Sequence, residues 1–132
     1  DDLQFERRRY SWTAAYGQSK LCNVLFTRAL AKRLEGTGVT VNALHPGGVA
    51  TGLAQNNGWW AVWITKLVRP FLRSPEKGAE TSIFLATAPE LAGVSGCYFS
   101  DSREVRPSRQ AEDAAAAERL WDLSARATGL PV

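Results

Sequence analysis

The sequence has 132 residues, 45% of them hydrophobic and 22% charged, which is typical of a soluble globular protein and argues against a disordered chain. This length suffices for one domain with a hydrophobic core and is short for two. The formal net charge is +3 and the arginines are scattered, so the sequence gives little support for a nucleic-acid partner.

Cysteine and histidine usage argues against a metal centre. The sequence has two distant cysteines, Cys22 and Cys97, and one histidine, so no zinc site is expected. Buried, reduced thiols and a cytoplasmic location fit this pattern. No secretory leader is present, and no apolar run reaches the ~20 residues of a membrane span. Because the sequence lacks methionine and begins Asp1-Asp2, we expect a piece of a longer protein.

The first half of the sequence predicts a helix, a strand and a sharp turn. Apolar positions recur with helical spacing from Ala14 to about Leu34, and glycines follow. Val39–Leu44 starts with β-branched residues and predicts a short buried strand. His45-Pro46-Gly47-Gly48 ends that strand. A helix, a tight turn and a buried strand in this order indicate an α/β fold with a parallel sheet.

The second half predicts three further helices and one strand. Aromatic and aliphatic residues at 60–71 form an amphipathic pattern that Pro70 kinks or ends. Ser74-Pro75 is typical of a helix start, here for a helix to about Thr87. Residues 96–99 are expected to form a short strand, and residues 111–127 an alanine-rich helix with Gly129 beyond its end.

Tyr16 and Lys20 are the residues most able to carry chemistry. They lie four apart in the first predicted helix, so their side chains share one face. Tyrosine is ordinarily a poor base at neutral pH, but a nearby ammonium favours the phenolate form and makes proton transfer accessible. The spacing alone is weak evidence. A boundary tyrosine beside a solvated lysine is the alternative interpretation.

The surroundings of this pair are more specific. After one helix and one strand comes Asn42-Ala43-Leu44-His45-Pro46-Gly47, a turn at the end of a strand, where open α/β sheets bind ligands. Together with Tyr16-Gly17-Gln18-Ser19-Lys20, this motif resembles the short-chain dehydrogenase/reductase family. Residues 25–28, 31–34 and 96–101, with Phe5 and Tyr10, are most similar to its retinol-dehydrogenase-like branch.

The resemblance implies a role for each matching residue. Tyr16 would exchange a proton with the oxygen of an alcohol or carbonyl, and Lys20 would support it and hydrogen-bond the nicotinamide ribose. The turn residues Pro46, Gly47, Gly48 and Val49 would pack beside the nicotinamide, and Thr51 would contact the carboxamide or phosphates. The implied cofactor is NADP or NAD, with NADP slightly favoured, and the implied substrate is a small apolar, retinol-like alcohol or carbonyl.

The resemblance also implies what is missing. The family's T-G-x-x-x-G-x-G phosphate loop does not occur, and Ser11, in the loop before Tyr16, is not assigned the role of the catalytic serine. We therefore expect residues 1–132 to form the C-terminal portion of one NAD(P)-binding Rossmann-like domain, a doubly wound parallel sheet, without its dinucleotide-binding half. One alternative is a catalytically incomplete fragment with a structural or interaction role. Another is a sugar-nucleotide epimerase or reductase, which the apolar C-terminal part disfavours.

The amphipathic stretch at 59–72 has two open interpretations. In the family this region forms a variable substrate lid, so Trp60, Trp63 and Phe71 could face a lipophilic substrate. A core, subunit or membrane-surface face is the other interpretation, which leaves a homo-oligomer and a peripheral membrane location open. The basic residues of this region, Lys66, Arg69 and Arg73, are expected to be solvated.

Other conspicuous residues are expected to be structural. His45 has no companion ligands and fits a hydrogen-bonded structural role. Asn42 is expected to satisfy backbone groups. Ser19 is expected to contribute packing, and Cys22 to be an inert buried thiol.

Overall fold

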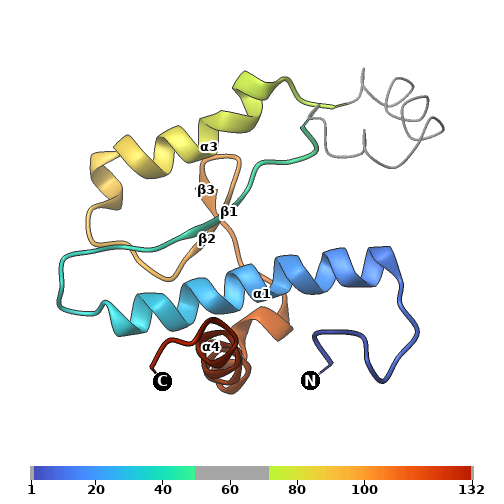
Figure 1. Ribbon diagram of the computed structural model, residues 1–132. Helices are drawn as coiled ribbons and strands as arrows, with labels where there is room; N and C mark the ends of the chain where they lie inside the picture. The colour runs from blue at the N-terminus through green and yellow to red at the C-terminus, as the bar shows by residue number, and fades with distance from the viewer. Residues whose placement is uncertain (1, 50–71, 132) are drawn as a thin grey trace. The chain divides into compact units, whose positions relative to one another are not determined.

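A computed structural model describes residues 2–49 and 72–131 (Figure 1). Its elements, in order along the chain, are α1 (Trp12–Arg33), β1 (Ala43–His45), α3 (Pro75–Thr87), η3 (Pro89–Leu91), β2 (Tyr98–Ser100), β3 (Arg103–Glu104), η4 (Arg109–Glu112) and α4 (Ala114–Thr128). The strands form one sheet in the order β1-β2-β3. Helices joined to short strands of one sheet confirm the predicted α/β class.

The sheet combines both strand directions. Backbone bonds from Gly96 to Val41 and from Ala43 to Cys97 advance in the same direction along both segments, so β1 and β2 run parallel. β2 and β3 pair antiparallel, with Phe99 opposite Glu104. The parallel pair agrees with the prediction, whereas β3 was not predicted.

The described residues divide into two compact units. The first contains the described residues of 1–43, 93–98 and 105–132, and the second contains those of 44–92 and 99–104. Each has its own set of packed side chains and hydrogen bonds, and each is described separately below.

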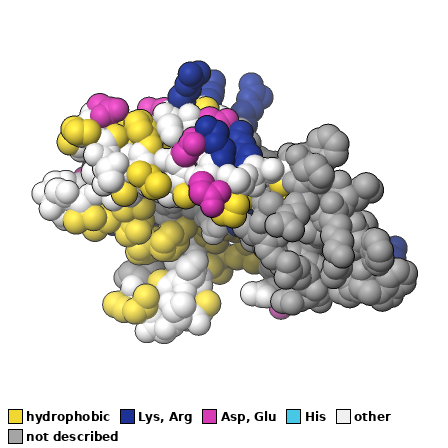
Figure 2. All heavy atoms as spheres, turned by 90° about the horizontal axis from the view of Figure 1, so that it is seen from above, with side chains coloured by type: hydrophobic (Ala, Val, Ile, Leu, Met, Phe, Trp, Pro, Cys, Tyr) yellow, Lys and Arg dark blue, Asp and Glu magenta, His cyan; other side chains and the backbone are white. Residues whose placement is uncertain are grey.

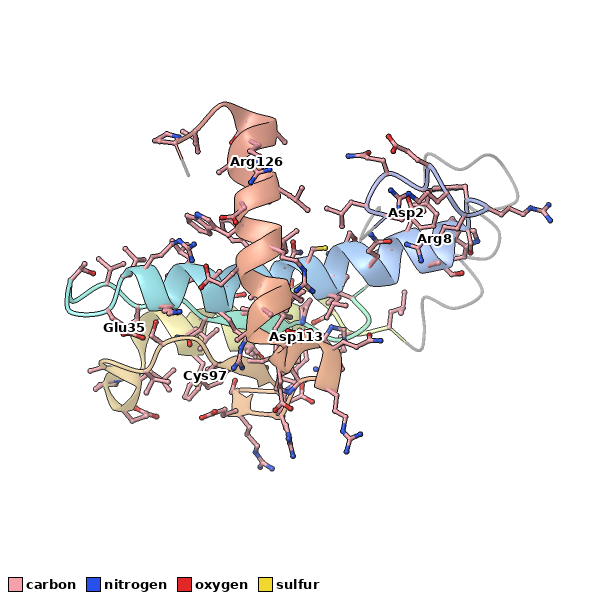
Figure 3. The ribbon with its side chains drawn as sticks, turned by 90° about the horizontal axis from the view of Figure 1, so that it is seen from below. Asp2, Arg8, Glu35, Cys97, Asp113 and Arg126 are labelled. Carbon is pink, nitrogen blue, oxygen red and sulfur yellow. The ribbon has the colours of Figure 1, made fainter. Side chains whose placement is uncertain are left out.

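The core of the first unit lies between α1 and α4. Leu25 and Ala29 of α1 pack against Ala117 and Leu120 of α4, and all four are at most 9% exposed. α4 lies across α1 in Figures 1 and 3, with Asp113 and Arg126 marking its two ends. Because two of the four core residues are alanines, the helices can approach closely where they cross.

Charged and aromatic side chains of α1 and α4 also contact one another beside this core. The Phe26 and Trp121 rings stack at 5.2 Å, and the Arg33 guanidinium lies 4.2 Å from the centre of the Trp121 ring. Arg33 also donates to Glu118 at 2.7 Å. This bond, with a smaller contribution from Lys32, lowers the pKa of Glu118. Arg33 therefore links the two helices through both its planar face and its charge.

The segment before β1 is held by side chains rather than by a regular ladder. The Asn42 amide donates to the Val94 carbonyl at 2.8 Å and accepts from the Cys97 N–H at 3.0 Å. The Val41 N–H donates to the Ser95 hydroxyl. Asn42 thus satisfies backbone groups, as predicted. The predicted strand at 39–44 is wrong in its boundaries: β1 begins at Ala43, and the residues before it are held by these side-chain bonds as well as by the backbone bond from Gly96 to Val41.

The second unit is built around α3 and the β2–β3 hairpin. The Ser74 hydroxyl accepts the N–H of Lys77 at 3.2 Å, which caps the helix as the Ser-Pro pair predicted. Thr81 is 4% exposed, and its hydroxyl accepts the N–H of Ser102 at 3.1 Å in the hairpin turn. Phe99, buried in β2, lies 6.4 Å from Phe84, centre to centre. One hydrogen bond and one aromatic contact therefore fasten the hairpin to the helix.

α4 confirms the last predicted helix, with one change at its start. Residues 109–112 form the 3-10 turn η4, and Asp113 then caps α4 by accepting the N–H of Ala116 at 2.9 Å. Gly129 ends it in the left-handed region at φ 71°.

The predicted helix at 60–71 lies outside the described residues, so its role as a lid or contact face is untested. Within residues 2–49 and 72–131, no helix is long and apolar enough to cross a membrane. The same residues contain no group of three or more His, Cys, Asp or Glu side chains able to hold a metal ion.

The α1–α4 crossing should dominate the stability of the first unit. We expect Leu120→Ala to lower the free energy of unfolding by about 2–4 kcal/mol, because it opens a cavity beside Leu25. Leu123→Ala, on the same helix but 47% exposed, is the matched control and should cost less than about 1 kcal/mol. Chemical denaturation measures both, and equal losses would contradict this placement of the core.

Candidate active site

Tyr16 and Lys20 share one exposed face of α1, as predicted. The Lys20 ammonium lies 5.3 Å from the centre of the Tyr16 ring, and the Tyr16 side chain is 49% exposed. The Ser19 hydroxyl bonds back to the Tyr16 carbonyl at 2.8 Å. The phenol is therefore accessible to a reactant, with a cation held one helical turn away.

The start of α1 is rich in exposed aromatic surface. Trp12 and Tyr10 are 72% and 67% exposed, and the Tyr10 ring meets Phe5 edge-on at 5.4 Å. The Arg8 guanidinium lies 4.1 Å from the centre of the same Phe5 ring. Arg8 also donates a hydrogen bond to the Gln18 side chain of α1. The loop before the helix is thereby tied to it, close in sequence to Tyr16.

An open groove of about 1040 Å³ runs along the first unit. Its apolar lining comes mainly from α1 and α4 and includes Leu21, Val24, Leu25, Leu120 and Leu123. Lys20 also lines it, whereas Tyr16 does not. The groove therefore reaches the Tyr16–Lys20 pair at Lys20 and does not include the phenol.

Cys22 lines the same groove. Partial burial raises the pKa of its thiol, which keeps it protonated and unreactive at neutral pH. The expectation of an inert thiol agrees with this shift. The expectation of full burial is wrong for both cysteines, because Cys22 and Cys97 are each partly exposed.

The second candidate element is the turn at Pro46–Val49, in the second unit. Gly47 has φ +80°, a conformation that favours glycine. The Arg73 N–H donates to the Gly48 carbonyl at 2.8 Å, and Val49 forms a parallel bridge with Arg73. Pro46 and Gly48 are exposed, so the turn presents backbone with little side chain.

The start of α3 supports this turn from one side. A Cβ atom added to Gly78 would lie 2.6 Å from Cγ2 of Val49 and 3.0 Å from its Cγ1. Gly78 is buried, so the valine side chain occupies the space that a larger residue would take. The helix thus needs glycine at this position to let the turn approach.

Arg73 covers the turn from another side. A Cβ atom added to Gly47 would lie 2.7 Å from Nε of Arg73 and 2.8 Å from its Cζ. The guanidinium in turn pairs with both carboxylate oxygens of Asp101, with Nη2 3.1 Å from Oδ2. The expectation that Arg73 is simply solvated is wrong, because it is held between a carboxylate and a glycine.

Opposite charges gather on the side of the molecule seen in Figure 2, where basic and acidic side chains lie next to one another. The second unit contributes the Arg73–Asp101 pair and an ion pair between Lys77 and Glu80 at 2.7 Å. The hydrogen bond from Arg73 lowers the pKa of Asp101, and charges on Lys77 and His45 add to this. His45 ends β1 as an exposed residue.

The predicted site residues thus fall into three groups. Tyr16 and Lys20 are brought together on α1, and Pro46, Gly47, Gly48 and Val49 form one supported turn. Thr51 lies outside the described residues. The Arg73–Asp101 pair was missed because its members are 28 residues apart and neither matches a motif.

Comparisons with known proteins agree with the motif. A family model described as short chain dehydrogenase matches residues 5–61. Human retinol dehydrogenase 14 is 46% identical over 98% of this chain and 39% of its own length. Human retinol dehydrogenase 13 is also 46% identical, over 98% of this chain and 41% of its own length. The chain belongs to the short-chain dehydrogenase/reductase family.

One more distant relative and one solved structure are also similar to this chain. A WW domain-containing oxidoreductase from Danio rerio is 40% identical over 96% of this chain and 31% of its own length. A crystal structure of an uncharacterised protein from Mycobacterium paratuberculosis superposes with a TM-score of 0.67 at 31% identity, covering 99% of this chain and 45% of that one. The chain is retinol-dehydrogenase-like and spans about two fifths of the length of the curated relatives it matches.

The contact between Gly78 and Val49 can be tested by stability. Gly78→Ala improves helix propensity by up to about 1 kcal/mol, but the new methyl group overlaps Val49, which typically costs about 1–3 kcal/mol. We therefore expect net destabilisation in chemical denaturation. A Val49→Ala change in the same protein should recover part of the loss.

Gly17→Ala is the matched control, because no atom lies within 4 Å of a Cβ added there. It should stabilise α1 by up to about 1 kcal/mol. If Gly78→Ala were stabilising to the same extent, the turn would not be packed against α3.

Proposed function

We propose that the chain belongs to an NAD(P)-dependent oxidoreductase that interconverts an alcohol and a carbonyl on an apolar, retinol-like substrate. The observation that carries the proposal is the Tyr16–Lys20 pair, with its exposed phenol and its ammonium 5.3 Å from the ring. The names and identities of the retinol dehydrogenase relatives support the substrate class.

Tyr16 is the proton-transfer residue in this proposal. In the direction of reduction its hydroxyl donates a proton to the substrate oxygen, and in the direction of oxidation its phenolate accepts one. Lys20 contributes a positive charge 5.3 Å from the centre of the Tyr16 ring, and such a charge favours negative charge on the oxygens taking part in the proton transfer. Lys20 also has spare donors for a ribose hydroxyl, since an ammonium has three N–H groups.

The turn at Pro46–Val49 is the cofactor-facing element. The bound nicotinamide supplies or accepts the hydride. Arg73 packs against Gly47, and Gly78 receives the Val49 side chain, so the position of the turn backbone that would face the nicotinamide is fixed. Thr51 is assigned to the carboxamide or phosphates by its place in the same motif. NADP is favoured over NAD by resemblance to the branch.

An apolar substrate suits the surface beside Tyr16. Trp12 and Tyr10 present aromatic surface at the start of α1, which a lipophilic alcohol can cover. Because such substrates partition into membranes, we keep a peripheral membrane contact through residues 59–72 as the alternative to a cytoplasmic location.

The decisive experiment is Tyr16→Phe in the full-length protein that carries this chain, assayed by NADPH oxidation with all-trans-retinal. Removing the hydroxyl should lower kcat by about 10²–10⁴-fold, which is the usual contribution of general acid–base catalysis. Tyr10→Phe is the matched control, because it removes the same atom from a neighbouring exposed tyrosine and should leave kcat unchanged. Retained turnover in Tyr16→Phe would remove the mechanism.

A titration of NADPH fluorescence separates this proposal from a purely structural role. Saturable binding, tighter for NADPH than for NADH, supports the enzyme and its cofactor preference. Absence of saturable binding by either nucleotide supports the alternative of a structural or interaction piece.

A further inference from the structure

The Arg73–Asp101 pair lies outside every motif that identified the site. The Arg73 guanidinium packs against Gly47 so closely that a Cβ atom on Gly47 would overlap it. Its backbone N–H binds the Gly48 carbonyl, and its side chain binds Asp101 in a bidentate pair. One residue therefore contacts the turn through both backbone and side chain.

Asp101 is a well-fixed anchor for this arginine. It lies in the β2–β3 turn at φ 52°, and the next residue, Ser102, has φ 56°. The Ser102 N–H donates to the buried Thr81 hydroxyl at 3.1 Å, which ties that turn to α3. The carboxylate is thus presented from a turn that is itself hydrogen-bonded to the helix.

We propose that Arg73, held by Asp101, is a positioning residue that fixes the Pro46–Val49 turn for nicotinamide binding. This inference rests on the proposed function, since it assumes that the turn meets the cofactor. Arg73 acts through the turn and touches neither substrate nor cofactor in this proposal. The planar, bidentate guanidinium is suited to the task because it keeps one orientation over Gly47, which a lysine ammonium would not.

The first test is Arg73→Ala in the full-length protein, compared with Arg106→Ala. Arg106 forms an equivalent bidentate pair with Glu112, at 2.8 Å and 3.0 Å, and belongs to the first unit rather than to the unit that contains the turn. Arg73→Ala should raise the dissociation constant of NADPH and lower kcat/KM by about tenfold or more, because small misplacements of a reacting group are costly. Arg106→Ala should change neither by more than about twofold, since exposed ion pairs contribute little.

A second test separates positioning from general loss of structure. Gly47→Ala places a methyl group where the guanidinium lies, so its effect on NADPH binding should be larger with Arg73 present than in Arg73→Ala. Such non-additivity is expected only when the two residues are in contact. Asp101→Asn keeps the shape of the anchor and weakens the pair, so it should reduce NADPH affinity in the same direction as Arg73→Ala but by less. Arg73→Lys should recover only part of the loss.

The outcomes distinguish the two proposals. Wild-type protein that binds neither NADPH nor NADH overturns both. Normal wild-type binding, loss of turnover in Tyr16→Phe, and unchanged NADPH affinity in Arg73→Ala overturn the positioning role alone. Additive effects of Gly47→Ala and Arg73→Ala on NADPH affinity also overturn it.

Discussion

The approach of the Pro46–Val49 turn to the start of α3 is the constraint on which the second unit depends. Gly47 lies beneath the Arg73 guanidinium, and Gly78 receives the Val49 side chain. Each contact exists because a Cβ atom is absent from one partner. The hydrogen bond from the Arg73 N–H to the Gly48 carbonyl and the parallel bridge between Val49 and Arg73 set the register of the two segments. The position of the turn therefore depends on the absence of side chains at Gly47 and Gly78.

The first unit depends on a different constraint, the division of α1 into two halves. Its C-terminal half buries Leu25 and Ala29 against α4, while its N-terminal half leaves Tyr16 exposed. The burial stabilises the helix that carries both Tyr16 and Lys20. Packing and proposed chemistry thus occupy separate stretches of one helix.

Much of this organisation could be predicted from sequence where the signals are local. The ends of α3 and α4 follow from Ser74-Pro75 and Gly129, because capping and left-handed residues act within one turn of the chain. The shared face of Tyr16 and Lys20 follows from helical spacing alone. The strand start at Ala43 did not, because the bonds of the Asn42 side chain to Val94 and Cys97 are contacts between distant segments that no local pattern signals. Arg73–Asp101 and Gly78–Val49 were not predictable, since no local pattern signals contacts between segments so far apart.

One arginine–carboxylate pair in each unit shows why geometry matters more than energy here. Asp101 with Arg73 and Glu118 with Arg33 are both exposed enough for water to screen their attraction. In both, the arginine lowers the pKa of the carboxylate, so this stabilisation is present above the ordinary carboxyl pKa and is lost only as pH falls below it. The pairs are therefore fully charged near neutrality. At neutral pH each pair fixes the orientation of its arginine. Arg33 lies over the Trp121 ring, and Arg73 lies over Gly47. An arginine whose plane is fixed in this way can shape backbone that carries no side chain of its own.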